Sequence, residues 1–152
     1  MTMDAHKDRT ALRLKLYEHG FTPLANKSKM CLIPGWSTID VTPELIQSPA
    51  WARSRAFQDT GIRCGDVVAL DWDIDDKVLL NKLLDAVVEN GLLPESPFVR
   101  IGRPPRELWV YRIQDKIGKR TTGHFMPVGA GADHKGFAVE VLGKGCQFAA
   151  YG

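Results

Sequence analysis

Two aspartates, Asp71 and Asp73, are the residues of this sequence best placed to do chemistry. They end the mostly apolar run Asp66–Asp73, which is typical of a strand covered on both faces. Because side chains alternate along a strand, both carboxylates should lie on one face, with Cα atoms about 7 Å apart and Trp72 on the other face. Carboxylates placed in this way can bind one Mg²⁺ or bridge two metal ions. We therefore predict a divalent-metal site at this pair.

Three other interpretations of the acids compete with this one. They could end the strand and cap the next helix, but Asp75 or Asp76 is enough for that purpose. A calcium-binding loop is excluded, because its sixth position would be Asp76 instead of glycine and its twelfth Lys82 instead of an acid. A solvated acidic surface remains open as an alternative.

Glu140 is a single acid within the apolar segment Phe137–Leu142. A glutamate in such a position usually faces solvent, and that interpretation stays open beside a role as a third metal ligand. The segment Gly143-Lys144-Gly145 follows at once, and its two glycines permit a tight turn that could approach a phosphate. This is not a Walker motif, which requires GxxxxGK[ST].

Basic residues gather around the Pro104-Pro105 dipeptide, and the planar fork of arginine suits phosphate oxygens. They are Arg100, Arg103, Arg106 and Arg112. Arg100 could project beside the acids, whereas Arg106 is more simply explained as a surface partner of Glu107. Further along the chain, Lys116, Lys119 and Arg120 could follow a nucleic-acid backbone. His124, in a glycine-rich segment, is given no role.

The elements that must position these residues can be predicted from periodicity and from helix signals. Helices are expected around Leu12–Tyr17 with an end at Gly20, from Thr42-Pro43-Glu44, and after Asp75 or Asp76 with an end at Gly91. Strands are expected at Met30–Ile33, Asp66–Asp73, Phe98–Ile101, Leu108–Ile113, Phe137–Leu142 and Gln147–Tyr151. The segment from Gly123 to Gly136 is expected to be a mobile loop. This order predicts an α/β or α+β domain with a mixed sheet.

Composition limits the class of protein. The chain has 152 residues, of which 44% are hydrophobic and 25% charged, as expected for one globular domain. Its formal net charge of +2 means that any surface for nucleic acid must be local. The three cysteines form no CxxC pair, which argues against a disulfide framework or a cysteine zinc site and makes a reduced, cytoplasmic setting the default. No apolar run suggests a signal peptide or a membrane partner.

Taken in order, these segments resemble the bifunctional primase–polymerase (Prim-Pol) domain of the archaeo-eukaryotic primase superfamily, in the form found in phage and plasmid replication proteins. The resemblance covers nearly the whole chain. It rests on Gly20–Leu24 with Lys29 and Pro34–Trp36, on Thr60–Gly65 leading into Val68–Asp73, on Arg100–Pro105, and on Val139–Gly145 with Gln147.

The resemblance implies a core sheet with RNA-recognition-motif-like topology and the addition of nucleotides to a 3′-hydroxyl on a DNA template, with Mg²⁺ or Mn²⁺ as cofactor. It implies that Asp71, Asp73 and Glu140 are the catalytic and metal-binding carboxylates. Four further residues would bind the nucleotide: Arg100, Arg103, Lys144 and Gln147. DNA and nucleoside triphosphates would be the partners, together with a helicase domain or subunit in some family members.

Two departures from the family keep other functions open. Many members carry a histidine on a central strand, but the corresponding segment here, Leu108–Tyr111, has none. Related sequences usually continue beyond this C-terminus, so the chain could be a fragment. A metal-dependent nuclease and a non-catalytic module that binds nucleotide or DNA in a replication protein therefore remain alternatives to a nucleotidyltransferase.

Overall fold

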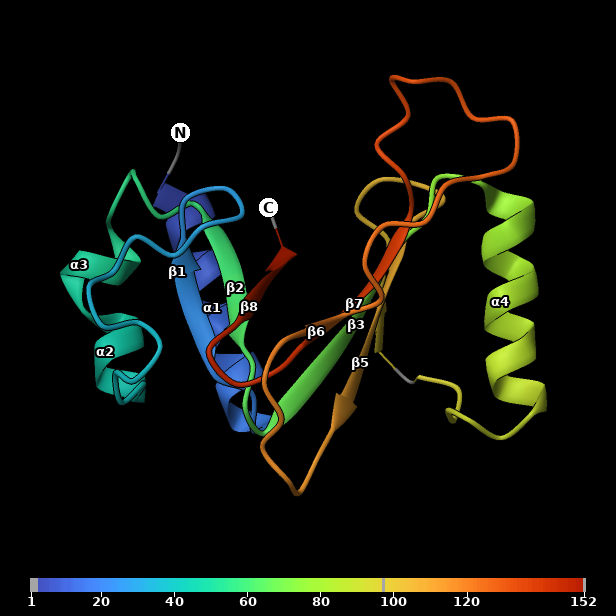
Figure 1. Cartoon of the computed structure of the whole chain (residues 1–152). Coiled ribbons are helices and arrows are strands. Elements are labelled where there is room, and N and C mark those ends of the chain that lie inside the picture. Colours follow the sequence, from blue (N-terminus) through green and yellow to red (C-terminus); the bar gives the residue numbers. More distant parts are fainter. Residues whose placement is uncertain (1–2, 97, 152) are drawn as a thin grey trace.

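The structure, a computed structural model that describes residues 3–96 and 98–151, contains two antiparallel sheets that pack face to face between helices (Figure 1). The three-stranded sheet has the order β1 (Pro23–Asn26), β2 (Asp59–Arg63), β8 (Gln147–Tyr151). The five-stranded sheet has the order β4 (Phe98–Arg100), β5 (Glu107–Arg112), β3 (Val67–Asp73), β7 (Ala138–Leu142), β6 (Arg120–Thr121). The helices are α1 (Met3–Glu18), α2 (Pro43–Gln47), α3 (Pro49–Ala52) and α4 (Lys77–Glu89).

The α+β class is therefore confirmed, but the mixed sheet is wrong. Every strand pairing in the described residues is antiparallel. A short connection explains one of these pairings, since β4 leads into its neighbour β5 through residues 101–106 alone. Parallel neighbours would need much longer crossovers.

Three clusters of apolar side chains hold the layers together. Between the two sheets lie residues of both, such as Ile62, Ala69 and Phe148. On the far side of the five-stranded sheet, Trp72 and Trp109 pack against α4. The remaining cluster joins α2 and α3 to β1. Figure 1 shows α2 and α3 on the outer side of the three-stranded sheet and α4 along the outer face of the five-stranded sheet, whereas Leu16 of α1 belongs to the cluster that contains residues of both sheets.

Most predicted elements appear close to their expected bounds, and most of the exceptions lie in the N-terminal half. The strand expected at Met30–Ile33 is wrong, because the chain reverses at Ser28 (φ 55°) and leaves Met30 and Leu32 exposed. The strand β1 precedes this turn and was missed, since its first residue is Pro23, a position where proline is tolerated in a strand. The elements β2, β6 and α3 were also missed.

The segment from Gly123 to Gly136 contains no helix or named strand, as expected for a loop. Phe125 of this segment forms an isolated bridge with Phe137, in which the two residues exchange backbone hydrogen bonds of 2.8 Å. Across the described part of the chain, no helix is both long and apolar enough to cross a membrane.

The helix α4 is capped by Asp76 and not by Asp75. One Asp76 carboxylate oxygen accepts hydrogen bonds from the backbone N–H groups of Val78 and Leu79, both at 2.9 Å. We expect Asp76→Ala to lower the free energy of unfolding by about 1 kcal/mol, because these two donors lose their acceptor. Urea denaturation measures this loss. The matched control is Asp75→Ala, because within the described structure the Asp75 carboxylate accepts hydrogen bonds from the side chain of Arg106 at the surface and not from the helix backbone. An equal loss in both variants would contradict the assignment of the cap.

Candidate functional site

Strand register brings the predicted site residues of β3, β4 and β7 into one row. Asp71 lies opposite Glu140 on one side and opposite Leu108 on the other, and Leu108 lies opposite Arg100. Directly opposite residues of antiparallel strands point to the same face, with Cα atoms about 4.5–5.5 Å apart. Arg100, Asp71 and Glu140 therefore share one face of the sheet.

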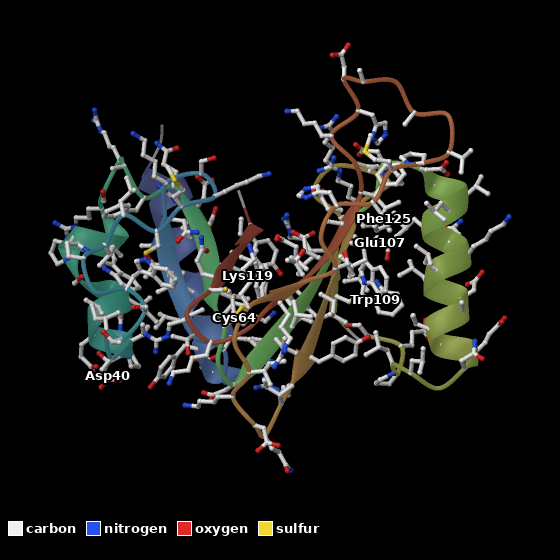
Figure 2. All side chains as sticks on the ribbon, viewed as in Figure 1. Asp40, Cys64, Glu107, Trp109, Lys119 and Phe125 are labelled. Carbon is white, nitrogen blue, oxygen red and sulfur yellow. The ribbon has the colours of Figure 1, made fainter. Side chains whose placement is uncertain are left out.

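Asp73 shares this face too, as alternation along β3 requires. Trp72 points the other way and packs edge-on against Trp109, with the two ring centroids 5.9 Å apart, on the side that α4 covers. Figure 2 shows the labelled Trp109 and Glu107 between the sheet and α4. The prediction that the two aspartates share a face opposite Trp72 is confirmed.

The face that carries the aspartates looks into a cavity of about 640 Å³ between the two sheets. One wall comes from the five-stranded sheet and the loop after β4, and includes Asp71, Asp73, Arg100, Arg103 and Arg106. The other wall comes from the three-stranded sheet and the turn after β1, and includes Ser28, Lys29, Asp59 and Tyr151. The sequence pattern does not predict this second wall, of which only Lys29 belongs to the segments that carry the family resemblance.

Asp71 is half-buried, and its surroundings raise its pKa. Burial is the largest cause, and the neighbouring negative charge of Asp73 is the next. Arg100 opposes the shift, while Glu140 adds to it. The negative charge of ionised Asp71 is therefore not fully offset by the positive groups around it. This is the electrostatic condition expected of a carboxylate that binds a cation.

Asp73 is already held by an arginine. Arg106 contacts the Asp73 carboxylate through Nη1, and its Nε and Nη2 donate to the two carboxylate oxygens of Asp75 at 2.6 and 2.7 Å. This pair of hydrogen bonds from Arg106 keeps the pKa of Asp75 below its usual range. The expected pairing of Arg106 with Glu107 is wrong, because Glu107 points to the other face and accepts from Trp109 Nε1 at 2.8 Å.

Glu140 is likewise paired with a base. Lys119 Nζ lies 2.9 Å from Glu140 Oε1, and this contact is the main reason why the pKa of Lys119 is raised. Among the residues that the structure describes, Asp71 lines the cavity but Glu140 does not. Glu140 is thus next to Asp71 in the sheet but turned toward Lys119.

These contacts decide how well a divalent metal would fit. In residues 3–96 and 98–151, no group of three or more His, Cys, Asp or Glu side chains is arranged to hold a metal ion. The donor chemistry and the shared face of Asp71, Asp73 and Glu140 suit Mg²⁺ or Mn²⁺. For all three to act as ligands, Arg106 must release Asp73 and Lys119 must release Glu140.

Arg100 and Arg103 both reach the cavity, in agreement with their expected proximity to the acids. The guanidinium of Arg100 lies over Gly102, where an added Cβ would be 2.8 Å from Nη2. Its Nε is buried and has no hydrogen-bond partner within the described structure. A buried, unsatisfied donor beside an open cavity is a candidate ligand for an anionic oxygen.

Lys144 and Gln147 lie outside this cavity, so the expectation that they join the same nucleotide site is not met by their positions. Lys144 is in the β7–β8 turn, beyond the end of the strand that carries Glu140, and lines a different, smaller cavity. The Gln147 side chain is used within the three-stranded sheet. It accepts from Asn26 Nδ2 at 2.9 Å and donates to the carbonyl of Lys29 at 2.6 Å.

Comparisons with models of protein families, with characterised proteins and with solved structures found no match for this chain. The class of protein is therefore defined by its own geometry. It is an α+β protein in which an acidic pair on a central strand faces an arginine-lined cavity between two antiparallel sheets.

Proposed function

We propose that this chain is a metal-dependent nucleotidyltransferase of the primase–polymerase type, which adds nucleotides to a 3′-hydroxyl on a DNA template. One observation carries the proposal: Asp71 and Asp73 share a cavity wall with Arg100 and Arg103. Acids for metal and arginines for phosphate are the two groups that phosphoryl transfer needs. The cavity volume of about 640 Å³ is in the range that holds a ligand of nucleotide size.

Topology supports the same proposal. Along the chain, β3, α4, β4 and β5 are followed by β7, and in the sheet β3 stands between β5 and β7. This strand order is similar to that of the split β-α-β arrangement, and the similarity supports the proposed RNA-recognition-motif-like core. The second helix of that arrangement is replaced here by the described segment 113–137, which contains the short strand β6.

The chain's own residues would act as follows. Asp71, with Asp73 and Glu140, would hold the divalent ion, which supplies positive charge to activate the attacking hydroxyl and to hold phosphate oxygens. Arg100 and Arg103 would donate hydrogen bonds to the triphosphate and stabilise the charge that develops on it. The walls of the cavity would orient the nucleotide between the two sheets.

A second function is favoured by one observation, the ion pairs that occupy two of the three acids. Arg106 holds Asp73 and Lys119 holds Glu140. If these pairs persist, the site has arginines for phosphate but too few free carboxylates for metal. The chain would then be a nucleotide- or DNA-binding module of a replication protein, without turnover.

Primer extension with labelled primer–template, nucleoside triphosphates and either Mg²⁺ or Mn²⁺ tests the proposal. The wild type should extend the primer, and the double variant Asp71→Asn, Asp73→Asn should not. The matched control is Asp85→Asn, Glu89→Gln, which removes the same charge from the exposed surface of α4 and should extend normally.

Each alternative has its own outcome in this assay. Loss of primer without added triphosphates would identify a nuclease. Binding of triphosphate or DNA by the wild type with no extension under either metal would favour the binding module. Undiminished extension by the double aspartate variant would rule out the assigned metal site.

A further inference from the structure

The turns at the other end of the two sheets enclose a second, smaller cavity of about 120 Å³. Its walls come from residues 20–22 after α1, from Ser37, from the β2–β3 turn at residues 63–67, from Lys116, and from the β7–β8 turn at residues 144–145. Val67 in this cavity and Asp71 in the first are four residues apart on β3, or about 13 Å. The cluster of side chains between the sheets separates them, so the two cavities are distinct.

The charges around this small cavity are mostly positive. Arg63, Lys116 and Lys144 line it, against one acid, Asp66. Asp66 is exposed and lies 3.8 Å from Lys116, so it offsets little of that charge. In the part of the chain that the structure describes, the Lys144 ammonium has no carboxylate partner.

Arg63 provides a fixed donor at this position. Its Nη1 donates to the carbonyls of Trp36 at 3.1 Å and Ile39 at 2.6 Å, which anchors the guanidinium against the loop before α2. Among the described residues, no acceptor is paired with Nε or Nη2 of Arg63. An arginine that is held by carbonyls and keeps part of its fork free is preorganised for an oxyanion.

The glycines of the two turns leave the cavity open. Gly65 (φ 153°) and Gly145 (φ 87°) have backbone conformations that L side chains rarely adopt. A Cβ at either position would meet no described atom within 4 Å, so the room beside the backbone is unfilled. The backbone N–H of Lys144 donates to the carbonyl of Ile117 at 2.6 Å, so it is the ammonium of Lys144 that this turn presents to a ligand.

The geometry points to a phosphate-binding site in this cavity, formed by Arg63, Lys116 and Lys144. Its volume is below the range of pockets for nucleotide-sized ligands and suits a single phosphate group. That group belongs either to a nucleic-acid backbone or to a free phosphate compound. The site is independent of the proposed nucleotidyl transfer and needs neither metal nor turnover.

Titration of the ¹⁵N-labelled whole chain with inorganic phosphate tests this site, with sodium chloride at equal ionic strength as the reference. Saturable shifts are expected at residues 20–22, 63–67 and 144–145. The variant Lys144→Gln should weaken phosphate binding about tenfold, because a charge-assisted hydrogen bond is lost. Lys82→Gln, an exposed lysine on α4, is the matched control and should bind phosphate as the wild type does.

A second arm uses a fluorescent single-stranded oligonucleotide without metal. If the source is a nucleic-acid backbone, Lys144→Gln lowers oligonucleotide affinity more than Lys82→Gln, and phosphate competes. If the source is a free phosphate compound, phosphate still shifts the three segments while the two variants bind the oligonucleotide equally. Absence of saturable phosphate shifts at these segments, or identical shifts in Lys144→Gln, would overturn the proposal, whatever the extension assay shows.

Discussion

Asp71→Asn is expected to make the metal-free protein more stable and, under the proposed function, much less active. The surroundings raise the pKa of Asp71, chiefly through burial and the charge of Asp73. A carboxyl whose folded-state pKa is raised supports folding below its unfolded pKa and loses that contribution as the pH rises through the folded value. The ionised carboxylate therefore opposes folding at neutral pH, and the neutral amide removes this effect.

The comparison needs two pH values and one control. The stability difference between Asp71→Asn and the wild type should be present at neutral pH and should disappear in acid, below the unfolded aspartate pKa of about 3.9. Urea denaturation measures it. Asp73→Asn should give no such gain, because it breaks the contact with Arg106. Destabilisation by Asp71→Asn at neutral pH would contradict the electrostatic account.

The activity of the same variant should fall by about two to three orders of magnitude in primer extension, since electrostatic groups at the transferring phosphate typically contribute that much. Mg²⁺ or Mn²⁺ should raise the stability of the wild type by binding the folded state, and should raise that of Asp71→Asn less. A functional residue that opposes folding is a common compromise at sites that accumulate like charge.

Arg13→Met is expected to cause the largest loss of stability, about 1–3 kcal/mol or more, which is the cost of leaving buried acceptors without a donor. Arg13 is 1% exposed and lies on α1, where its guanidinium joins α1 to α3 and β2. It donates to Thr60 Oγ1 at 3.2 Å and to three carbonyls, those of Trp51 (3.2 Å), Phe57 (3.0 Å) and Asp59 (2.9 Å). Burial lowers the pKa of Arg13 to about 10, so the side chain still carries its charge at neutral pH.

Methionine is apolar and similar in length to arginine, so the variant fills the space but removes the donors to the three carbonyls. The carbonyl of Phe57 keeps a second donor, Arg9 Nη1, at 3.4 Å. Chemical denaturation measures the loss. Lys15→Met is the control: it makes the same kind of change on the exposed side of α1 and should alter stability by less than about 0.5 kcal/mol. If Arg13→Met lost no more than this control, the bonds of Arg13 would not be what holds α1 to β2.

Local patterns account for what could be predicted. The strand that carries Asp71 and Asp73 follows from its apolar run, and their shared face follows from alternation along one strand. The capping of α2 by Thr42 and of α4 by Asp76, one of its two predicted caps, also depends only on neighbouring residues. The weak predictions were those of the N-terminal sheet, where β1 is four residues long and begins with proline.

Register and long-range contacts account for the rest. Glu140 is opposite Asp71 only because β7 pairs with β3 in that alignment. The same alignment carries Lys144 to the far end of the sheet, although it follows Glu140 closely in sequence. Arg13 stands between Leu12 and Leu14 in an N-terminal helix that also carries the exposed Lys15, and nothing in that pattern distinguishes the buried arginine from a solvated basic residue.

The sequence by itself thus determined the acidic pair, its strand and the class of fold, because strand periodicity and caps act over a few residues. Only the tertiary structure decided which groups lie around that pair. Arg100 lies on the same cavity wall, Arg106 contacts Asp73, and the three-stranded sheet provides the second wall. The tertiary structure also pairs the neighbouring Glu140 with Lys119. The physical reason is that these contacts depend on how strands align and how two sheets pack. Both are set by the sum of many distant interactions and not by any single segment.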